Sequence, residues 1–265
     1  MARFCLALCL GTGLAVSSLC YYMYRKKKKT VEKLDNAPHI NIDGKLKDTL
    51  EVTPGACLQY AVVEGVVEPV DEALRSQFHE DIDGVLHKLK VRERRLGWSG
   101  YSNILGLNDR VLHKQVPFVL RGSDETAVRV HCPLQASGLK MKMTYKKLHQ
   151  FHGFDDLAGF HLNMLNRKGH LQTEEMLKVG TTVTGVGKLT LDTEGTLSLR
   201  PPSDGSQYFL STADYDTLRN QYKAATKVWK NLTVACALAG TVALCCVGLR
   251  YYQHRKLRFT EKNDL

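Results

Sequence analysis

Residues 232–249 read LTVACALAGTVALCCVGL, eighteen consecutive residues without a charged side chain, and this stretch decides the architecture of the chain. At about 1.5 Å per residue, such a helix is roughly 27 Å long, close to the roughly 30 Å of a bilayer's hydrocarbon core. Trp229 and Lys230 precede the stretch and Arg250 follows it, as is typical of the two water interfaces of a membrane span. We therefore predict a transmembrane helix rather than a buried core helix.

A second uncharged stretch, residues 4–24, reads FCLALCLGTGLAVSSLCYYMY. Its 21 residues would form a helix of roughly 31 Å. A cleaved secretory signal has a similar pattern, but the basic run that follows resists translocation and favours a retained anchor. That run consists of Arg25, Lys26, Lys27, Lys28 and Lys29. The sequence thus predicts two spans, with both termini on the same side of the bilayer.

The formal net charge of +10 is concentrated beside the two predicted spans. Residues 30–229 contain 25 Lys and Arg and 25 Asp and Glu, so the region between the spans is neutral as a whole. A basic residue near an anionic leaflet contributes about 1 kcal/mol to membrane association. The charge distribution therefore indicates a lipid bilayer as partner, and we expect no nucleic-acid partner.

The region between the spans is rich in strand patterns separated by turn residues. Strands are predicted at residues 57–67, 85–96, 116–120, 127–131, 179–191, 195–199 and 207–210. A faint likeness between residues 60–70 and 179–191, each with β-branched residues leading into a glycine, suggests two related halves. We predict an α+β membrane protein whose middle domain is mostly β and barrel-like, with two related halves as one possibility.

Helices are predicted at residues 42–52, at 148–165, and from Thr212 onward without a break into the second span. The predicted organisation follows from these elements. Residues 1–3 form the N-terminal tip, 4–24 the first span, 25–29 the basic run, 30–211 the β-rich domain, 212–231 a connecting helix, 232–249 the second span and 250–265 a short basic tail.

Catalytic motifs are sparse in this sequence. Cys57 is a candidate nucleophile only if the fold brings a histidine beside it. Four histidines lie in one region, but their spacing is irregular and no paired cysteines accompany them, which argues against zinc. They are His149, His152, His161 and His170. A membrane enzyme that acts through Cys57 or these histidines remains one functional hypothesis.

Several longer motifs resemble the mitochondrial ubiquitin ligase family called MULAN or MAPL. They include PGAC and YAVVEG near residues 54–65, EEMLKVG at 174–180, TGVG at 184–187 and LRPP at 199–202. The motif residues that carry the resemblance are Pro54, Gly55, Cys57, Tyr60, Glu64, Gly65, Glu174, Glu175, Gly180, Gly185, Gly187, Pro201 and Pro202. The resemblance covers nearly the whole chain, including both predicted anchors.

The resemblance implies an outer mitochondrial membrane protein whose middle GIDE, or "beside a membrane", domain faces the intermembrane space, with both termini in the cytosol. It also implies RING-type transfer of ubiquitin or SUMO, effects on mitochondrial fission and innate immunity, and partners from the ubiquitin pathway. The family's zinc-binding RING would follow the second span. Residues 250–265 contain no cysteine and one histidine, whereas a RING needs eight Cys or His ligands.

We therefore expect no catalytic, metal or cofactor residue in this chain, and we leave open whether it is an enzyme. The leading hypothesis is a non-catalytic regulator that pairs with RING-containing relatives or with itself. The alternative is a truncated form of an active RING-type E3 ligase.

Overall fold

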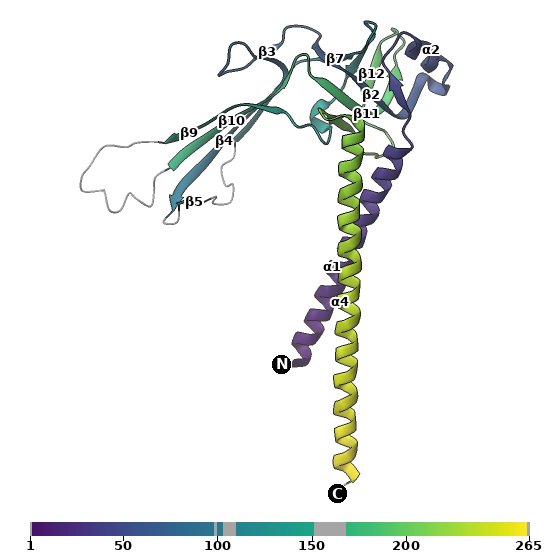
Figure 1. Cartoon of the computed structure of the whole chain (residues 1–265), viewed down its shortest axis with the longest axis vertical. Helices are drawn as coiled ribbons and strands as arrows, with labels where there is room; N and C mark the ends of the chain where they lie inside the picture. Colours follow the sequence, from purple (N-terminus) through teal and green to yellow (C-terminus); the bar gives the residue numbers. More distant parts are fainter. Residues whose placement is uncertain (1, 98–99, 103–109, 151–167, 264–265) are drawn as a thin grey trace, which may run out of the picture. The chain divides into compact units, whose positions relative to one another are not determined.

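The computed structural model describes residues 2–97, 100–102, 110–150 and 168–263. The chain divides into two units, which are a helical unit formed by Met1–Asn36 with Tyr215–Leu265 and a β-rich domain formed by Ala37–Asp214. The long helices in Figure 1 belong to the first unit and all the strands belong to the second.

Five strands of the β-rich domain close into a barrel (Figure 1). Their order around the barrel is β2 (Cys57–Pro69), β7 (Phe118–Arg121), β8 (Ala127–Val130), β12 (Leu197–Arg200) and β11 (Thr182–Leu191), and β11 pairs again with β2. All neighbours are antiparallel except β8 and β12, which are parallel. This order is that of a five-stranded barrel of the OB type. Short strands β1 (His39–Asn41) and β13 (Phe209–Ser211) pair with β2 and β11.

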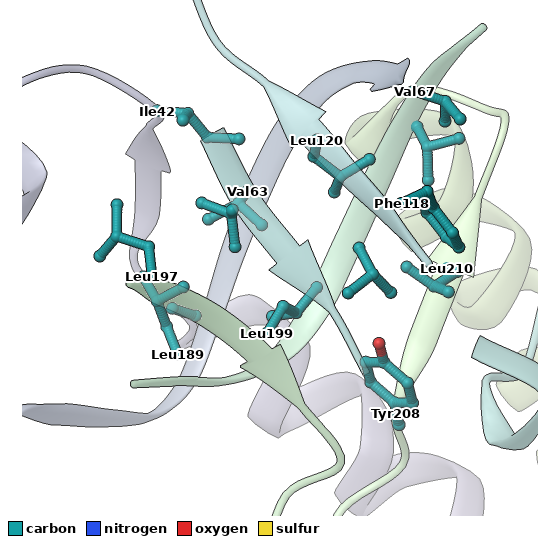
Figure 2. Packing of buried hydrophobic residues seen from close by; sticks show 14 of the residues in the cluster. Ile42, Val63, Val67, Phe118, Leu120, Leu189, Leu197, Leu199, Tyr208 and Leu210 are labelled. Carbon is teal, nitrogen blue, oxygen red and sulfur yellow. The ribbon is translucent and has the colours of Figure 1, made fainter. Parts of the chain in front are cut away.

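The barrel interior is a continuous apolar core, because alternate side chains of each strand point inward. Figure 2 shows side chains from several strands converging there, among them Val63, Leu120 and Leu199, all with no exposed surface. Helix α2 (Lys45–Val52) adds the buried Leu46 and Leu50, one turn apart on its inner face.

Glycines permit close approach between the barrel strands. A Cβ atom on Gly65 would lie 2.8 Å from the carbonyl oxygen of Arg121, and one on Gly185 would lie 2.5 Å from Cδ2 of Leu199. At Gly65 the close atom belongs to the backbone, so β2 requires glycine there, whereas at Gly185 the leucine side chain of β12 would have to shift.

A second, open sheet is built from two insertions into the barrel (Figure 1). The first insertion lies between β2 and β7 and the second between β8 and β11. Strand β4 from the first insertion pairs with β10 from the second over eleven register positions. The strands are β3 (Leu74–Arg75), β4 (Asp83–Gly97), β5 (Gly100–Ser102), β6 (Arg110–Gln115), β9 (Lys142–Gln150) and β10 (Lys168–Lys178). Single 3-10 turns, η1 (Pro54–Ala56) and η2 (Pro133–Gln135), precede β2 and follow β8.

The helical unit consists of α1 (Ala2–Asp35) and α4 (Tyr215–Asn263). The two helices are antiparallel, because Leu34 near the end of α1 lies beside Tyr215 at the start of α4, and Lys27 lies beside Tyr222. One described helix is long and apolar enough to cross a membrane, namely the part of α4 from Tyr215 to Arg250. The predicted span at residues 4–24 is helical, but it does not pass the same test on the described residues.

The seven predicted strands are all present, and so is the predicted helix that corresponds to α2. The predicted unbroken helix through residues 232–249 is also present as α4, and it starts at Tyr215 rather than Thr212. The suggestion of two related halves is wrong, because the stretches that prompted it, β2 and β11, are paired neighbours of one barrel. The helix predicted at residues 148–165 is wrong at its start, where residues 148–150 belong to β9. Residues 151–167 lie outside the described part of the chain.

Candidate functional site: a buried carboxylate network

A buried carboxylate, Glu174 in β10, is the centre of the most connected polar cluster of the open sheet. Its side chain has no exposed surface, and both carboxylate oxygens accept two hydrogen bonds. Oε1 accepts from the backbone N–H of Gln77 at 2.9 Å and from Nε2 of His87 at 2.7 Å. Oε2 accepts from the hydroxyls of Ser76 and Thr144, each at 2.6 Å. The charge is therefore fully hydrogen-bonded, as burial requires.

The four partners of Glu174 come from three segments, because Ser76 and Gln77 are neighbours in the chain. His87 is in β4, Thr144 is in β9, and Ser76 follows β3. The register places His87 opposite Met176, two residues along β10 from Glu174, so both polar side chains lie on the same face of the sheet. Because an ionised carboxylate only accepts, we assign the shared hydrogen to Nε2 of His87.

The network fixes the loop after β3 against this face. The Ser76 hydroxyl donates to Glu174 and accepts from the backbone N–H groups of Phe78 and His79 at 3.3 and 3.2 Å. The ring of Phe78 stacks on that of Tyr145 in β9, with ring centroids 3.8 Å apart and an interplanar angle of 6°. One carboxylate thus joins three strands and a loop.

The hydrogen bonds determine the ionisation of this carboxylate. Burial alone disfavours the charged form, but the bonds from Ser76, Thr144, Gln77 and His87 outweigh burial, so the pKa of Glu174 lies below its ordinary value of 4.5. A carboxylate that stays ionised and saturated with donors suits a structural role.

Serine, histidine and glutamate in one cluster resemble a catalytic triad only in composition. In a triad the histidine accepts the serine proton and the carboxylate orients the histidine. Here the Ser76 hydroxyl donates to Glu174 itself, and His87 donates to the other oxygen of the same carboxylate. The arrangement stabilises the sheet and leaves the serine without a base.

The structure gives limited support to chemistry at Cys57 or the histidines. Cys57 starts β2, and its Sγ atom lies 3.6 Å from Nε2 of Gln59. Strand register places His149 opposite His170 across β9 and β10. His152 and His161 lie outside the described residues. Within the described part of the chain, no group of three or more His, Cys, Asp or Glu side chains could hold a metal ion.

Most of the other motif residues lie in or beside the barrel strands, and Glu175 lies in the open sheet. Pro54 and Gly55 form the turn η1, in which Gly55 adopts the left-handed conformation with φ of 74°. The Tyr60 hydroxyl donates to the carbonyl of Gln207 at 3.0 Å, and Glu64 accepts from the Thr184 hydroxyl at 2.9 Å. A Cβ on Gly187 would lie 2.7 Å from the carbonyl oxygen of Arg200, so glycine leaves room for that group.

The remaining motif residues lie at three other places. Glu175 forms an ion pair with Lys88 at 3.5 Å. Gly180 has a φ of 79° in the turn into β11, and Pro201 and Pro202 follow β12.

The resemblance singled out Glu174, but sequence reasoning missed Ser76, His87 and Thr144. His87 lies within the strand predicted at residues 85–96, and nothing there marks it as a partner of Glu174. Ser76 and Thr144 are short polar residues, 98 and 30 positions from Glu174, and nothing local in the sequence links them to it. Only the pairing of the two insertions reveals the cluster.

The helical unit has a polar cluster of its own, outside the apolar stretches. Asp35 at the end of α1 pairs with Arg219 and, at 3.0 Å, with Lys223 of α4. Burial raises and these hydrogen bonds lower the pKa of Asp35, and the net shift is downward. The Tyr215 hydroxyl donates to the carbonyl of Leu34 at 2.7 Å.

The predicted membrane flanks lie on the two long helices. Lys27 of the basic run lies over the ring of Tyr222, 5.2 Å from its centroid. Arg25, Lys26, Lys28 and Lys29 are exposed on α1, and so are Lys230 and Arg250 on α4, whereas Trp229 is half-buried. Solvent-facing bases and an aromatic beside an apolar helix are typical of a membrane interface.

Known proteins match this chain over nearly its whole length. A family model described as "GIDE: E3 Ubiquitin ligase" matches residues 109–246. The chain is 50% identical over 259 residues to Mitochondrial ubiquitin ligase activator of nfkb 1-A of Danio rerio, an alignment that covers 96% of this chain and 76% of that protein. It is 34% identical to Mitochondrial ubiquitin ligase activator of NFKB 1 of Homo sapiens, covering 97% of this chain and 75% of that protein.

A more distant relative is Mitochondrial E3 ubiquitin protein ligase 1 of Drosophila melanogaster, 30% identical over 252 residues, which covers 93% of this chain and 73% of that protein. No solved structure matches the chain. The identity, the coverage and the family model agree. The chain therefore belongs to the mitochondrial ubiquitin ligase activator of NFKB family, with its GIDE domain.

Proposed function

We propose that this protein is an outer mitochondrial membrane protein of its family's ubiquitin-ligase pathway, and that residues 1–265 contribute a regulatory or docking role rather than the transfer reaction itself. One observation supports this proposal above others. Over more than nine-tenths of its length, the chain matches relatives named ubiquitin ligase activators of NFKB and a relative named E3 ubiquitin protein ligase. Residues 251–265 supply only His254 as a possible Cys or His ligand of zinc, so these residues do not themselves form the two zinc sites of a RING.

The proposed topology has two spans, with the β-rich domain in the intermembrane space and both termini in the cytosol. Strong apolar character over Tyr215–Arg250 supports the second span. The uncharged residues 4–24 and the basic run after them support the first. The antiparallel packing of α1 and α4 agrees with two helices that cross the same bilayer in opposite directions.

Regulation would occur by association with RING-containing relatives or with a second copy of this chain. The shared GIDE domain gives this chain and its relatives similar surfaces through which they can associate. Co-purification of the tagged chain with a RING-containing relative in mild detergent supports this association, and its repeated absence would remove it.

An in vitro ubiquitination assay tests the central proposal. The purified full chain is incubated with E1, E2, ubiquitin and ATP, and a RING-containing relative serves as positive control. We expect no ubiquitin conjugates from the chain alone and a changed rate when it is added to the relative. Autoubiquitination by the chain alone would refute the proposal.

A second candidate function is supported by the coverage of the relatives, of which the chain spans about three quarters. In this alternative the protein is a RING-type E3 ligase of which these residues are a part. Transcript sequencing beyond the codon for Leu265 tests it. A Cys-x2-Cys pattern followed by Cys-x-His in the same frame would favour the alternative, and a stop codon would exclude it.

A further inference from the structure

The neutral charge of the region between the spans hides a strongly uneven distribution. Strands β4, β6, β9 and β10 of the open sheet contain twelve Lys and Arg and four Asp and Glu. Two of the four acids are already paired, because Glu174 is buried in its network and Glu175 contacts Lys88. The open sheet is therefore basic, and the rest of the domain carries the compensating acids.

The strand register divides these residues between the two faces of the sheet, since residues directly opposite each other share a face. Lys90 of β4 is opposite Val111 of β6 on one side and Thr173 of β10 on the other, and Thr173 is opposite Lys146 of β9. Neighbouring rows extend this surface, which we name the basic face. It comprises Lys88, Lys90, Arg92, His113, Lys146, Val111, Met143, Leu171, Thr173 and Glu175.

The basic face is the face opposite the carboxylate network. Side chains alternate between the two faces along β10, so Glu174 lies on the face opposite Thr173 and Glu175. The loop containing Ser76 and Phe78 contacts Glu174 and Tyr145, so it covers the face opposite the basic face. On the basic face, apolar side chains are exposed between the bases. Val111 is 42% exposed and Met143 is 51% exposed.

This combination matches the chemistry of an anionic bilayer surface. The lysines and the arginine of this face, on β4 and β9, match a plane of phosphate headgroups, and the exposed valine and methionine side chains can enter the boundary with the acyl chains. Base stacking on a nucleic acid requires aromatic rings, and among the ten residues named for the basic face only His113 has one, while Tyr145 is stacked on Phe78 on the other face.

The proposed span in α4 tethers the β-rich domain to a bilayer. The tether also holds the bilayer at a high effective concentration.

We propose that the basic face binds anionic phospholipid headgroups of the membrane in which α4 is anchored. The open sheet then holds the domain on the bilayer, in addition to the helices. This inference depends on the span in α4 and is independent of any role in ubiquitin transfer.

Hydrogen exchange of the full chain in lipid nanodiscs tests the inference. One sample contains phosphatidylcholine alone, and the other contains phosphatidylcholine with about 30% phosphatidylserine. We expect amides of β6 and β9 to exchange about tenfold more slowly in the anionic discs, and this protection to disappear in about 0.5 M salt. Equal exchange in both kinds of disc would overturn the proposal, even if an acidic protein or a nucleic acid bound the chain.

A pair of charge-reversal variants provides a matched control. K90E/K146E reverses two charges of the basic face and should abolish the lipid-dependent protection. K45E/K47E makes the same change in net charge at two exposed lysines of α2 and should retain it. Unchanged exchange of the barrel strands confirms that both variants fold. Equal loss of protection in the two variants would show a non-specific charge effect and would refute the proposal.

Discussion

Replacement of Glu174 by alanine should destabilise the open sheet far more than the barrel. The variant leaves Ser76, Thr144, His87 and the N–H of Gln77 without their acceptor. Four hydrogen bonds to a charged group, at about 1.5–3 kcal/mol each, would sum to at least about 6 kcal/mol. The wild-type protein, however, also bears the cost of removing the carboxylate from water, and the alanine variant does not. Breaking a buried charged network costs about 3–5 kcal/mol. We therefore expect a loss of about 4 kcal/mol.

Hydrogen exchange measured by mass spectrometry on the full chain in detergent is a suitable assay, because it reports each strand separately. A loss of about 4 kcal/mol corresponds to exchange roughly 900-fold faster for amides of β9 and β10 that open by local unfolding. Glu175→Ala is the matched control, because this neighbouring carboxylate is 29% exposed and forms an ion pair with Lys88 at 3.5 Å. Its expected effect is below about 1 kcal/mol. Equal effects of the two substitutions would refute the assigned role of Glu174.

The same residue predicts an acid sensitivity. Because the pKa of Glu174 is lowered in the folded state, its contribution to stability is fully present above about pH 4.5 and is lost as the pH falls toward the folded value. Glu174→Gln cannot ionise, so that part of the pH dependence should vanish in this variant. An identical acid profile for the wild type and Glu174→Gln would contradict the reasoning.

Three further changes test other parts of the structure. Gly65→Ala places a Cβ 2.8 Å from a backbone carbonyl oxygen and should lower the free energy of unfolding by about 1–3 kcal/mol. Gly44→Ala is the control, because its Cβ would lie 3.9 Å from the nearest atom, and it should change the free energy of unfolding little. Denaturant melts monitored by circular dichroism compare the two variants. Asp35→Asn removes two ion pairs of the helical unit and should reduce its stability by about 1 kcal/mol in thermal melts, and a wild-type melting temperature would count against a stabilising role for these pairs. Ala225→Pro should break α4 between the β-rich domain and the proposed span, at a cost of about 3 kcal/mol in helix stability, and so uncouple the domain from its anchor. Unchanged regulatory activity of this variant would show that a continuous helix is not required.

Local patterns predicted the barrel strands because those strands are apolar and are bounded by turn residues. Residues 57–69 and 182–191 combine β-branched side chains with glycine, and both form central barrel strands. The same reasoning identified α2 from two leucines one turn apart. These elements bury one consistent set of side chains, so pattern and burial agree.

Strands β9 and β10 could not be predicted in this way. Residues 142–150 and 168–178 are dense in lysine, histidine and glutamate, because they form an open sheet with an exposed basic face. Their stability depends on the pairing of two distant insertions and on one buried carboxylate, and neither leaves a local pattern. The resemblance to the family drew attention to Glu174, but not to its partners.

The neutral charge of residues 30–229 illustrates the same limit. A sum over the sequence hides the separation of charge that the sheet topology creates. Closure of the barrel by pairing of β2 with β11 likewise joins residues more than 100 positions apart. The two similar stretches, β2 and β11, are neighbours in this one barrel and do not lie in separate barrel-like halves.

Alkaline carbonate extraction of mitochondria that express the full chain tests the membrane anchoring on which the account depends. Integral proteins stay with the lipid pellet under this treatment, while peripheral proteins are released. We predict that the chain stays in the pellet, and that a variant with charged residues placed within 232–249 is recovered less completely there. Release of the unaltered chain into the supernatant would contradict the account.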